Sequence, residues 1–383
     1  MSSNSLPFDS GKLDRLMEDD GIDVLIASSK HNIQYLLGGY RFFFFDAMDA
    51  IGLSRYLPLL VYPKGRPDKA AYLGNAMESG ADLWPDTTAT QFWGTRDVTE
   101  RAIAHINSLG SAPAVIGVET GFLPADAYTT LTDAFPASRF EDAVVALERL
   151  RAVKTPEEIA LLRNASEQVV AAMLSVLGSH GPGAVKRDLV EALRVEETRR
   201  GLGFDYCLAT VGTSLNRAPS GEIWQDGDIA SLDSGGNYRG YIGDLCRMAI
   251  LGEPDAQLAD LLAEIDAIQM AARAPIKSGA PGGDVIAAGQ AAHAAAPSRN
   301  HTSFVAHGMG LVSHEAPRLM GDGPVPYPGD DADRPLEAGM VLSIETTMQH
   351  PERGFIKLED TVLVTDDGWE GLGDQGRGWN RAG

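Results

Sequence analysis

The residues best suited to chemistry are four carboxylates and one histidine that lie in otherwise apolar stretches of the chain. They are Asp233 in IASLDSGG, Asp244 in GYIGDLCRMAI, His307 in FVAHGMGL, Glu345 in GMVLSIETT and Glu359 in FIKLEDTVLV. An ionised carboxylate in an apolar strand is costly unless a positive charge compensates it. The basic residues nearby in the sequence are too few to pair with all four carboxylates, so the pattern predicts bound metal ions.

Two divalent metal ions match this set in charge and in ligand type. Their positive charge equals the negative charge of the four carboxylates, and a neutral imidazole adds none. Carboxylates with one histidine suit Mn, Fe, Co or Zn better than copper. Two ions about 3.5 Å apart activate a water molecule and hold both the attacking and the leaving atoms of a hydrolysis. The pattern therefore favours hydrolytic chemistry.

The spacing of the carboxylates predicts that they meet on one face of a sheet. Asp233 and Asp244 stand on the two arms of an expected hairpin that turns at residues 237–240. Glu345 and Glu359 lie on two further consecutive strands. Because side chains alternate between the faces of a strand, each pair can point to the same side.

The order and contexts of these residues resemble the ligand set of the pita-bread metallohydrolases, which include methionine aminopeptidase, aminopeptidase P, prolidase and the metal-free creatinase. The segments GYIGDLCRMAILGEP, HGMGLVSHE, LEAGMVLSIE and IKLEDTVLV are similar to their motifs, and the likeness covers about residues 154–370. GIDVLIAS and NIQYLLGG more loosely resemble the N-terminal domain of creatinase and prolidase. Methionine aminopeptidase lacks that domain, so the chain resembles the two-domain branch.

The resemblance implies a role for each of the five residues. Asp233 is expected to chelate one ion, whereas Asp244 and Glu359 are expected to bridge both. His307 and Glu345 are expected to hold the second ion. Glu345 is also expected to act in catalysis by passing a proton from the bridging water.

Two residues that follow His307 are implied to contact the substrate. His314 matches the family's second histidine, which hydrogen-bonds the substrate carbonyl or the tetrahedral intermediate and so stabilises developing charge. Arg318, four residues further on, is a candidate for a bidentate pair with a substrate carboxylate. A surface arginine without a role is the alternative interpretation of Arg318.

The chain departs from the peptidases of this superfamily in two places. They carry a further histidine upstream of the first aspartate, where Asn216 in TSLNRAP is the nearest match here. Asparagine cannot act as a general acid near neutral pH. Thr346 and Thr347 stand where prolidases usually have a proline-containing turn. Both departures weaken an assignment to Xaa-Pro cleavage and leave the predicted metal ligands untouched.

A lyase of the same fold is a further alternative. Dimethylsulfoniopropionate lyases resemble this chain in the KLED strand. They carry an extra aspartate where this chain has Gly235, and another aspartate near the second histidine, where this chain has Ser313 and His314. These differences argue against the lyase.

Helices and strands of two different arrangements are expected to position these residues. Strands alternating with helices in the first part favour a small α/β domain, and runs of strands framed by long helices in the second part favour an α+β fold, with helices covering one face of a curved antiparallel sheet. The expected helices are 12–20, 98–109, 125–135, 155–178, 186–200 and 258–273, and the expected strands are 22–27, 59–62, 115–119, 229–236, 243–251, 340–346 and 355–365.

The boundary between the two parts is marked by a helix start. In Thr155-Pro156-Glu157-Glu158, the threonine can cap the helix and Glu158 can reach back to the threonine amide. A chain of 383 residues is also long for a single core. We therefore expect a creatinase/prolidase-like domain over residues 1–150 and a pita-bread catalytic domain over residues 151–383.

Composition and charge limit the classes of binding partner and the cellular compartment that we expect for this chain. The net charge of −21 and a pI near 4.7 disfavour binding to nucleic acid. The two cysteines, Cys207 and Cys246, are too few for a disulfide framework. The first ten residues lack the pattern of a signal peptide, and the apolar runs are shorter than the ~20 residues of a membrane span. A cytoplasmic protein without nucleic-acid or membrane partners is expected.

An aromatic cluster in the first part suggests self-association. Residues 41–45 read RFFFF, and Trp84 and Trp93 follow. If this segment is a strand, its rings point to both faces, and one face needs a cover outside the domain. We expect a homodimer in which residues 40–45 or Trp93 border the partner's substrate pocket, although packing within the small domain is the simpler interpretation.

The leading functional hypothesis is a dinuclear-metal hydrolase that cleaves a C–N bond in a small substrate, such as an Xaa-Pro dipeptide or a short peptide. The absent upstream histidine keeps open a non-peptide amidohydrolase, creatinase-like or ectoine-hydrolase-like. A non-catalytic binding module of this fold is less favoured, because such proteins typically lose metal ligands and this chain retains all five.

Overall fold

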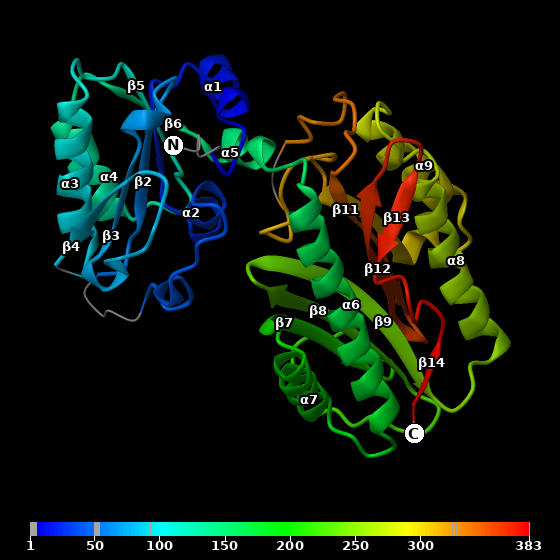
Figure 1. The fold of residues 1–383 in the computed structure, drawn as a ribbon. Helices are drawn as coiled ribbons and strands as arrows, with labels where there is room; N and C mark the ends of the chain where they lie inside the picture. The colour runs from blue at the N-terminus through cyan, green and yellow to red at the C-terminus, as the bar shows by residue number, and fades with distance from the viewer. Residues whose placement is uncertain (1–5, 50–53, 92, 324, 326–327, 383) are drawn as a thin grey trace. The chain divides into compact units, whose positions relative to one another are not determined.

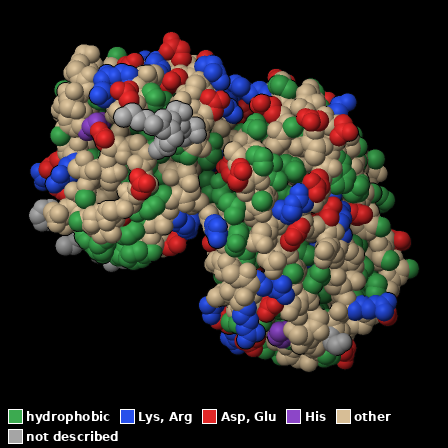
Figure 2. All heavy atoms as spheres, viewed as in Figure 1, with side chains coloured by type: hydrophobic (Ala, Val, Ile, Leu, Met, Phe, Trp, Pro, Cys, Tyr) green, Lys and Arg blue, Asp and Glu red, His purple; other side chains and the backbone are tan. Residues whose placement is uncertain are grey.

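The computed structural model describes residues 6–49, 54–91, 93–323, 325 and 328–382. The chain divides into two compact units, Met1–Arg151 and Ala152–Gly383. No helix among the described residues is long and apolar enough to span a membrane. Acidic and basic side chains are interspersed over the face shown in Figure 2, where hydrophobic side chains also gather on part of the first unit.

The first unit alternates helices and strands (Figure 1). Its elements are α1 (Ser10–Asp19), β1 (Val24–Ala27), α2 (Lys30–Leu36), β2 (Leu59–Pro63), β3 (Ala71–Asn75), β4 (Asp86–Thr90), α3 (Thr95–Ser108), β5 (Val115–Val118), α4 (Ala125–Ala134), β6 (Arg139–Asp142) and α5 (Val144–Leu150). The strands form one mixed sheet in the order β4-β3-β2-β1-β5-β6. Apolar residues of α1, α2 and α5 form one core and those of α3 and α4 another, so two layers enclose the sheet.

The aromatic segment differs from the expected strand. Phe43–Asp46 forms a 3-10 helix, which turns once in three residues. Phe42 and Phe45 therefore point inward together and are buried, whereas Phe43, on the other side of the turn, is 65% exposed. The alternating-face argument was wrong for this segment. An exposed aromatic face nevertheless remains, since Trp93 is also 41% exposed.

The second unit combines four long helices with eight strands among the described residues (Figure 1). Its elements are α6 (Pro156–Ser179), α7 (Lys186–Arg199), β7 (Gly203–Val211), β8 (Ile229–Tyr238), β9 (Tyr241–Leu251), α8 (Ala256–Arg273), α9 (Gly282–Ala295), β10 (Thr302–Gly308), β11 (Val341–His350), β12 (Gly354–Val364), β13 (Trp369–Leu372) and β14 (Asn380–Ala382). The predicted helix after Thr155 begins with the expected capping box, which confirms that prediction.

One sheet of the second unit carries all five predicted ligands. Its main order is β10-β11-β12-β9-β8-β7, and these strands pair antiparallel with their neighbours. Helices α6 and α7 pack against β7, β8 and β9, whereas α8 and α9 pack against β10, β11 and β12. This arrangement confirms the predicted α+β class, with helices over an antiparallel sheet and an α/β unit before it.

The helices cover a single face of this sheet. Gly243 of β9 lies so close to α6 that a Cβ there would meet the Ala165 backbone at 2.7 Å. Asp360 of β12 pairs with Arg273 of α8 at 2.8 Å. Because side chains alternate along a strand, the neighbouring residues Asp244 and Glu359 point to the other face. That face is left for the carboxylates.

Candidate metal centre

Strand register aligns the predicted ligands across four strands. Glu345 of β11 stands opposite Glu359 of β12, Glu359 stands opposite Cys246 of β9, and Cys246 stands opposite Asp233 of β8. Directly opposed residues point to the same side of a sheet. Asp244 lies two residues from Cys246 on β9 and therefore shares this face.

The hairpin that carries the two aspartates is closed by a two-residue turn. Arg239 and Gly240 both have positive φ, 54° and 97°, as a type I′ turn requires. Asp244 pairs with Gly235 across the hairpin. A Cβ at Gly235 would meet the Tyr206 ring at 2.4 Å. Tyr206 hydrogen-bonds to Asp244, so this glycine makes room for a ring that orients a predicted ligand.

His307 comes from β10, and a tight loop returns His314 onto it. The imidazole rings stack with centroids 3.6 Å apart and an interplanar angle of 19°. Gly308 permits this return, since a Cβ there would meet the backbone of Ala316 at 2.4 Å. The loop is fixed by a buried ion pair in which Lys154 Nζ lies 3.0 Å from Glu315 Oε1. A glycine and a buried ion pair thus hold two histidines together.

The structure brings the predicted ligands into two groups. Donor atoms of Asp233, Asp244 and Glu359 lie within 4.8 Å of one another, and so do those of His307, His314 and Glu345. His307 Nε2 is 3.1 Å from Glu345 Oε1. His314, expected to contact substrate, therefore also lies among atoms that can bind a metal. Both groups have the geometry and the donor types of a divalent-cation site.

A lysine that the sequence analysis overlooked lies among these carboxylates. Lys357 Nζ is 2.7 Å from Asp233 Oδ2, 2.8 Å from Glu345 Oε2 and 2.7 Å from Glu359 Oε2, and its side chain is only 5% exposed. It stands two residues before Glu359 on β12, so it shares the same face. The premise that the nearby basic residues cannot compensate the carboxylates was therefore too strong.

Burial and neighbouring carboxylates raise the pKa values of two of the four carboxyl groups. Burial and the charges of Glu359 and Asp233 raise the pKa of Asp244 well above its usual value. Burial and Glu345 raise the pKa of Glu359 to about 7. Carboxyl groups behave in this way when they repel one another without enough cations nearby. The residues therefore fit one or more divalent cations, which would supply the missing positive charge.

The two histidines differ in their protonation. Burial alone would lower the pKa of His307, but its hydrogen bond to Glu345 and the charges of Glu345 and Glu359 more than offset this effect and raise it. Burial, followed by the charge of His307, lowers the pKa of His314 to about 4. His314 is therefore a neutral imidazole near pH 7, able to donate one N–H to a substrate oxygen.

An arginine borders the cluster at the position next to Asn216. Arg217 contacts Asp233 through Nη2, and its guanidinium carbon lies 4.9 Å from the centre of the Phe355 ring. Asn216 itself faces its own loop, because its Oδ1 accepts from the Ala218 amide at 3.1 Å. Arg217, which the sequence analysis did not single out, thus reaches the site where the expected match does not.

A cavity of about 600 Å³ opens beside the cluster. Its lining includes Arg217, Glu345, Phe355 and Lys357. Arg318, the predicted substrate-binding residue, is absent from the described lining, and its backbone amide donates to Asp331 at 2.9 Å. Because Glu345 belongs to one of the donor groups, this cavity is a candidate substrate pocket.

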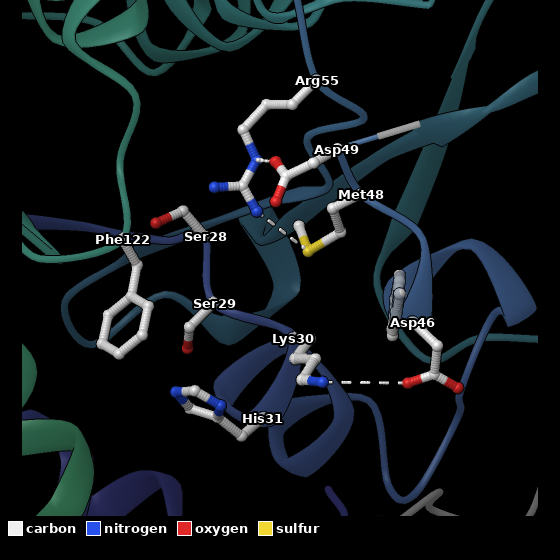
Figure 3. A pocket seen from close by; sticks show the side chains of 10 residues that line it. Ser28, Ser29, Lys30, His31, Asp46, Met48, Asp49, Arg55 and Phe122 are labelled. Carbon is white, nitrogen blue, oxygen red and sulfur yellow. Dashed lines mark hydrogen bonds and ion pairs between the residues drawn. The ribbon is translucent and has the colours of Figure 1, made fainter. Parts of the chain in front are cut away.

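A second cavity, of about 260 Å³, lies within the first unit (Figure 3). Ser28, Ser29 and His31 line it with four charged residues. Its cations are already paired, Lys30 with Asp46 at 3.8 Å and Arg55 with Asp49 at 3.5 Å. This cavity therefore lacks the excess charge that characterises the centre in the second unit.

Comparison with protein families decides the assignment of the chain. The model described as metallopeptidase family M24 matches residues 160–366, more than half of the chain, and the creatinase/prolidase N-terminal domain matches residues 11–153. This chain belongs to metallopeptidase family M24. It is therefore a metal-dependent peptidase, and the resemblance to the two-domain pita-bread branch is confirmed.

Named relatives of this M24 chain are peptidases. A probable dipeptidase PepE from Mycobacterium tuberculosis is 30% identical over 68% of each chain. An Xaa-Pro dipeptidase from Lactobacillus delbrueckii is 24% identical over 94% of this chain and 95% of its own length. Likeness to the second relative extends over both units.

Solved structures show the same fold along the full chain. An Xaa-Pro dipeptidase from Bacillus anthracis has a TM-score of 0.79 at 21% identity and covers 97% of this chain and 98% of its own. The N-terminal domain of the FACT complex subunit SPT16 from Cicer arietinum has a TM-score of 0.72 at 12% identity, covering 98% of this chain and all of its own. This fold is thus shared by a dipeptidase and by a subunit of the FACT complex, so function has to be inferred from the site.

Proposed function

We propose that this M24 peptidase is an Xaa-Pro dipeptidase or an aminopeptidase P-like enzyme that hydrolyses a C–N bond in a short peptide with two divalent metal ions. The observation that carries the proposal is the pair of adjacent donor groups on one sheet face, with a cavity beside them. The description of the Lactobacillus relative as an Xaa-Pro dipeptidase supports the substrate class.

Five residues are proposed to hold the metal ions: Asp233, Asp244, His307, Glu345 and Glu359. Their oxygen and nitrogen donors suit Mn, Co, Fe or Zn. Ions bound there would supply Lewis-acid polarisation of the scissile carbonyl and a lowered pKa for water. Ser343 supports the set, since its Oγ donates to Glu359 Oε1 at 3.0 Å and orients that carboxylate.

Two residues are proposed to act on the reacting atoms. The neutral His314 donates an N–H to the oxygen on which charge develops, and its stacking on His307 fixes the ring. Glu345 accepts a proton from the water that attacks the scissile carbonyl. Lys357 and His307 favour its ionised form, because they hold the pKa of Glu345 below its usual range despite burial, which acts in the opposite direction.

A non-peptide amidohydrolase is the second candidate. The absence of a histidine in 213–219, together with Asn216 folded onto its own loop, removes a group that the family's peptidases carry. The lyase of this fold has less support, because the Tyr206 ring occupies the space that an aspartate at Gly235 would need. A binding module without catalysis also has less support, because both donor groups are intact.

The first unit is proposed to mediate a homodimer through its exposed aromatic face. Phe43 and Trp93 are the exposed rings of this face, and Phe44 packs edge-on against Trp93 with ring centres 4.5 Å apart. Phe43→Asp should shift the sedimenting species from dimer to monomer, whereas Phe45→Asp would disturb the core. A monomeric wild type at micromolar concentration with full activity would contradict the dimer.

The cytoplasm is the proposed compartment. Cys207 and Cys246 are both free and buried. Burial raises the pKa of each thiol, so neither is a reactive thiolate near neutral pH. Two unpaired thiols in a core of this kind are typical of proteins in a reducing environment.

The test is a substrate panel on protein loaded with Mn²⁺, Co²⁺ or Zn²⁺. Ala-Pro and Gly-Pro should be hydrolysed, Ala-Ala more slowly, and excess chelator should abolish the reaction. Creatine and ectoine serve as non-peptide substrates in the same panel. Turnover of either of these without peptide cleavage would establish the amidohydrolase instead, and full peptide cleavage in chelator would refute the role of the metal ions.

A further inference from the structure

The sheet of the second unit consists of two halves that meet between β9 and β12. Within the halves, β8 pairs with β9 and β11 pairs with β12 along nearly their whole length. Between the halves, the register among the described residues consists of one pair, Glu359 with Cys246. The line where the two halves meet, the seam, is therefore closed by direct strand pairing at a proposed metal ligand.

The C-terminal segment, residues 369–382, lies in the rest of the seam. Its first strand, β13, pairs with β12, and its last strand, β14, pairs with β9, on the edges that β11 and β8 leave free (Figure 1). Arg247 of β9 holds this segment between its two strands. Its Nη2 donates to the Gly373 carbonyl at 2.7 Å, and its Nε donates to the Gln375 carbonyl at 2.5 Å.

Arg247 also links the two halves directly. Its side chain is fully buried, and its Nη1 donates to the Cys246 carbonyl at 2.8 Å and to the Glu359 carbonyl at 3.0 Å, one in each half. Four of its five N–H groups thus donate to main-chain carbonyls, and Nη2 also lies 2.8 Å from Asp360 Oδ1. A planar fork with five donors suits this task, whereas the single nitrogen of a lysine cannot reach as many acceptors.

The two donor groups of the candidate metal centre differ in their relation to the seam. One group spans the seam, because Asp233 and Asp244 stand on β8 and β9 and Glu359 stands on β12. The other group lies within one half, because its histidines and its glutamate come from β10, the loop after β10, and β11. A change in the spacing of the two halves therefore alters the first group and spares the second.

We infer that Arg247 is a positioning residue that fixes the spacing of the seam-spanning donor group and so sets the affinity of this group for a divalent cation. The inference rests on the proposed function, which places a metal ion in this group. On the open face, Lys357 Nζ contacts Asp233 and Glu359 across the seam, but it acts on side chains. Arg247 acts on the backbones that carry the ligands. Removing an outer contact of a metal site typically lowers metal affinity by about 10–100-fold.

The experiment measures Mn²⁺ binding to metal-stripped protein by calorimetry, in wild type and in Arg247→Lys. The substitution keeps the positive charge beside Asp360 and removes the fork. Wild type should bind two ions. In the variant, one affinity should fall by about 10–100-fold, whereas the other should stay within about two-fold of wild type. Electron–nuclear double resonance should show nitrogen coupling to the ion that the variant retains, because the group within one half contains the histidines.

Arg273→Lys is the matched control. Arg273 belongs to α8 and pairs with the same Asp360 at 2.8 Å, so the control makes the same substitution in the same buried network but away from the strands of the seam. Both Mn²⁺ affinities should stay within about two-fold of wild type. Gly373→Ala is a second variant, because a Cβ there would meet the Ser166 carbonyl oxygen at 2.9 Å and displace the C-terminal segment. It should weaken the same ion by a smaller factor, and it replaces Arg247→Lys as the test if that variant does not fold.

An equal loss of both affinities in Arg247→Lys would overturn the inference, because it would show a general loss of structure. Two unchanged affinities would overturn it as well. A wild type that binds a single ion would instead refute the two-ion part of the proposed function. Hydrogen exchange then tests the seam without metal. Amides of residues 243–248 and 357–361 should exchange about 10-fold faster in Arg247→Lys than in Arg273→Lys, and equal exchange would overturn the inference.

Discussion

Two buried charge clusters lie on opposite faces of β12, around neighbouring residues. On the open face, Glu359 gathers with three further carboxylates, which pair with Lys357 and Arg217. On the helix-covered face, Asp360 pairs with Arg247 and Arg273, each at 2.8 Å, and with Arg377. The two clusters have similar burial and different charge balance.

The difference in charge balance separates a binding site from a structural contact. Burial alone would raise the pKa of Asp360, but the three arginines hold it below its usual range. On the open face the pKa values of Asp244 and Glu359 are raised instead. In the helix-covered cluster Asp266 and Asp374 join Asp360 against the three arginines. In the open cluster the four carboxylates outnumber the ammonium of Lys357 and the guanidinium of Arg217. An excess of buried negative charge points to a bound cation.

The largest effect is expected from Glu359→Ala. This variant removes the carboxylate proposed to be shared by both ions, so the purified protein should lose its metal and its activity should fall to assay background. Folding should survive, because one member of a mutually repelling set has gone. Elemental analysis of the variant beside wild type checks this prediction. Undiminished metal in the variant would show that Glu359 is not a ligand.

The neighbouring variant Asp360→Asn should lose stability and keep its metal. Two buried arginines and the partly buried Arg377 lose their common partner, which should lower the free energy of unfolding by ~3–5 kcal/mol. Metal per folded chain should not change. Urea denaturation measures the loss, with Glu370→Gln as control, since its exposed pair with Arg163 should contribute less than ~1 kcal/mol. A stability loss no greater than that of the control would contradict a structural role for the helix-covered cluster.

Within the open cluster, His314→Ala should separate catalysis from metal binding. If His314 stabilises developing charge, kcat should fall by ~10²–10³-fold, equivalent to ~2.7–4 kcal/mol. The metal content should remain that of wild type, because His307 and the four carboxylates are intact. Kinetic measurements and elemental analysis of the same preparation distinguish a catalytic role of His314 from a role in metal binding. Loss of metal in this variant would make His314 a ligand, which its position beside His307 and Glu345 also allows.

The open cluster was predictable from the sequence to the extent that its strands were. The hairpin of Asp233 and Asp244 follows from alternation and a turn signal, and its register places both on one face. Lys357 carries the same signal, two residues from Glu359, yet was missed because the basic residues near the carboxylates were judged only by their number. Arg217 lies in a loop without periodicity, and only tertiary contacts show where it points.

Other misses have local physical causes. β10 was not predicted because TSFVAHG is short and alternates poorly. α9 begins with Gly282 and Gly283, residues that disfavour helices, and is formed through packing on α8. The RFFFF segment has strand-like composition, but Phe42 and Phe45 can both be buried only when the chain turns every three residues.

Glu197 of α7 extends the comparison, because this buried carboxylate belongs to neither donor group and forms no ion pair with an arginine among the described residues. Its Oε1 accepts a hydrogen bond from Oγ of Ser234, the residue after Asp233, at 2.7 Å. Its Oε2 has no hydrogen-bond partner among the described residues. Burial is the main cause that raises the pKa of Glu197 to about 7, and the charge of Asp205 adds to it. A proton thus neutralises this carboxylate.

The smallest expected effect is the pH dependence that this proton causes. Because the pKa is higher in the folded state than in the unfolded chain, the stabilisation is complete below about pH 4.5 and is lost as pH rises through about 7. The full loss is about 3 kcal/mol. Glu197→Gln keeps the acceptor for Ser234 and cannot ionise, so it should be more stable than wild type at pH 8 and lose this advantage at pH 5. Urea midpoints of both proteins at the two pH values, at equal metal loading, measure the difference, and a difference that does not change with pH would show that Glu197 is ionised throughout.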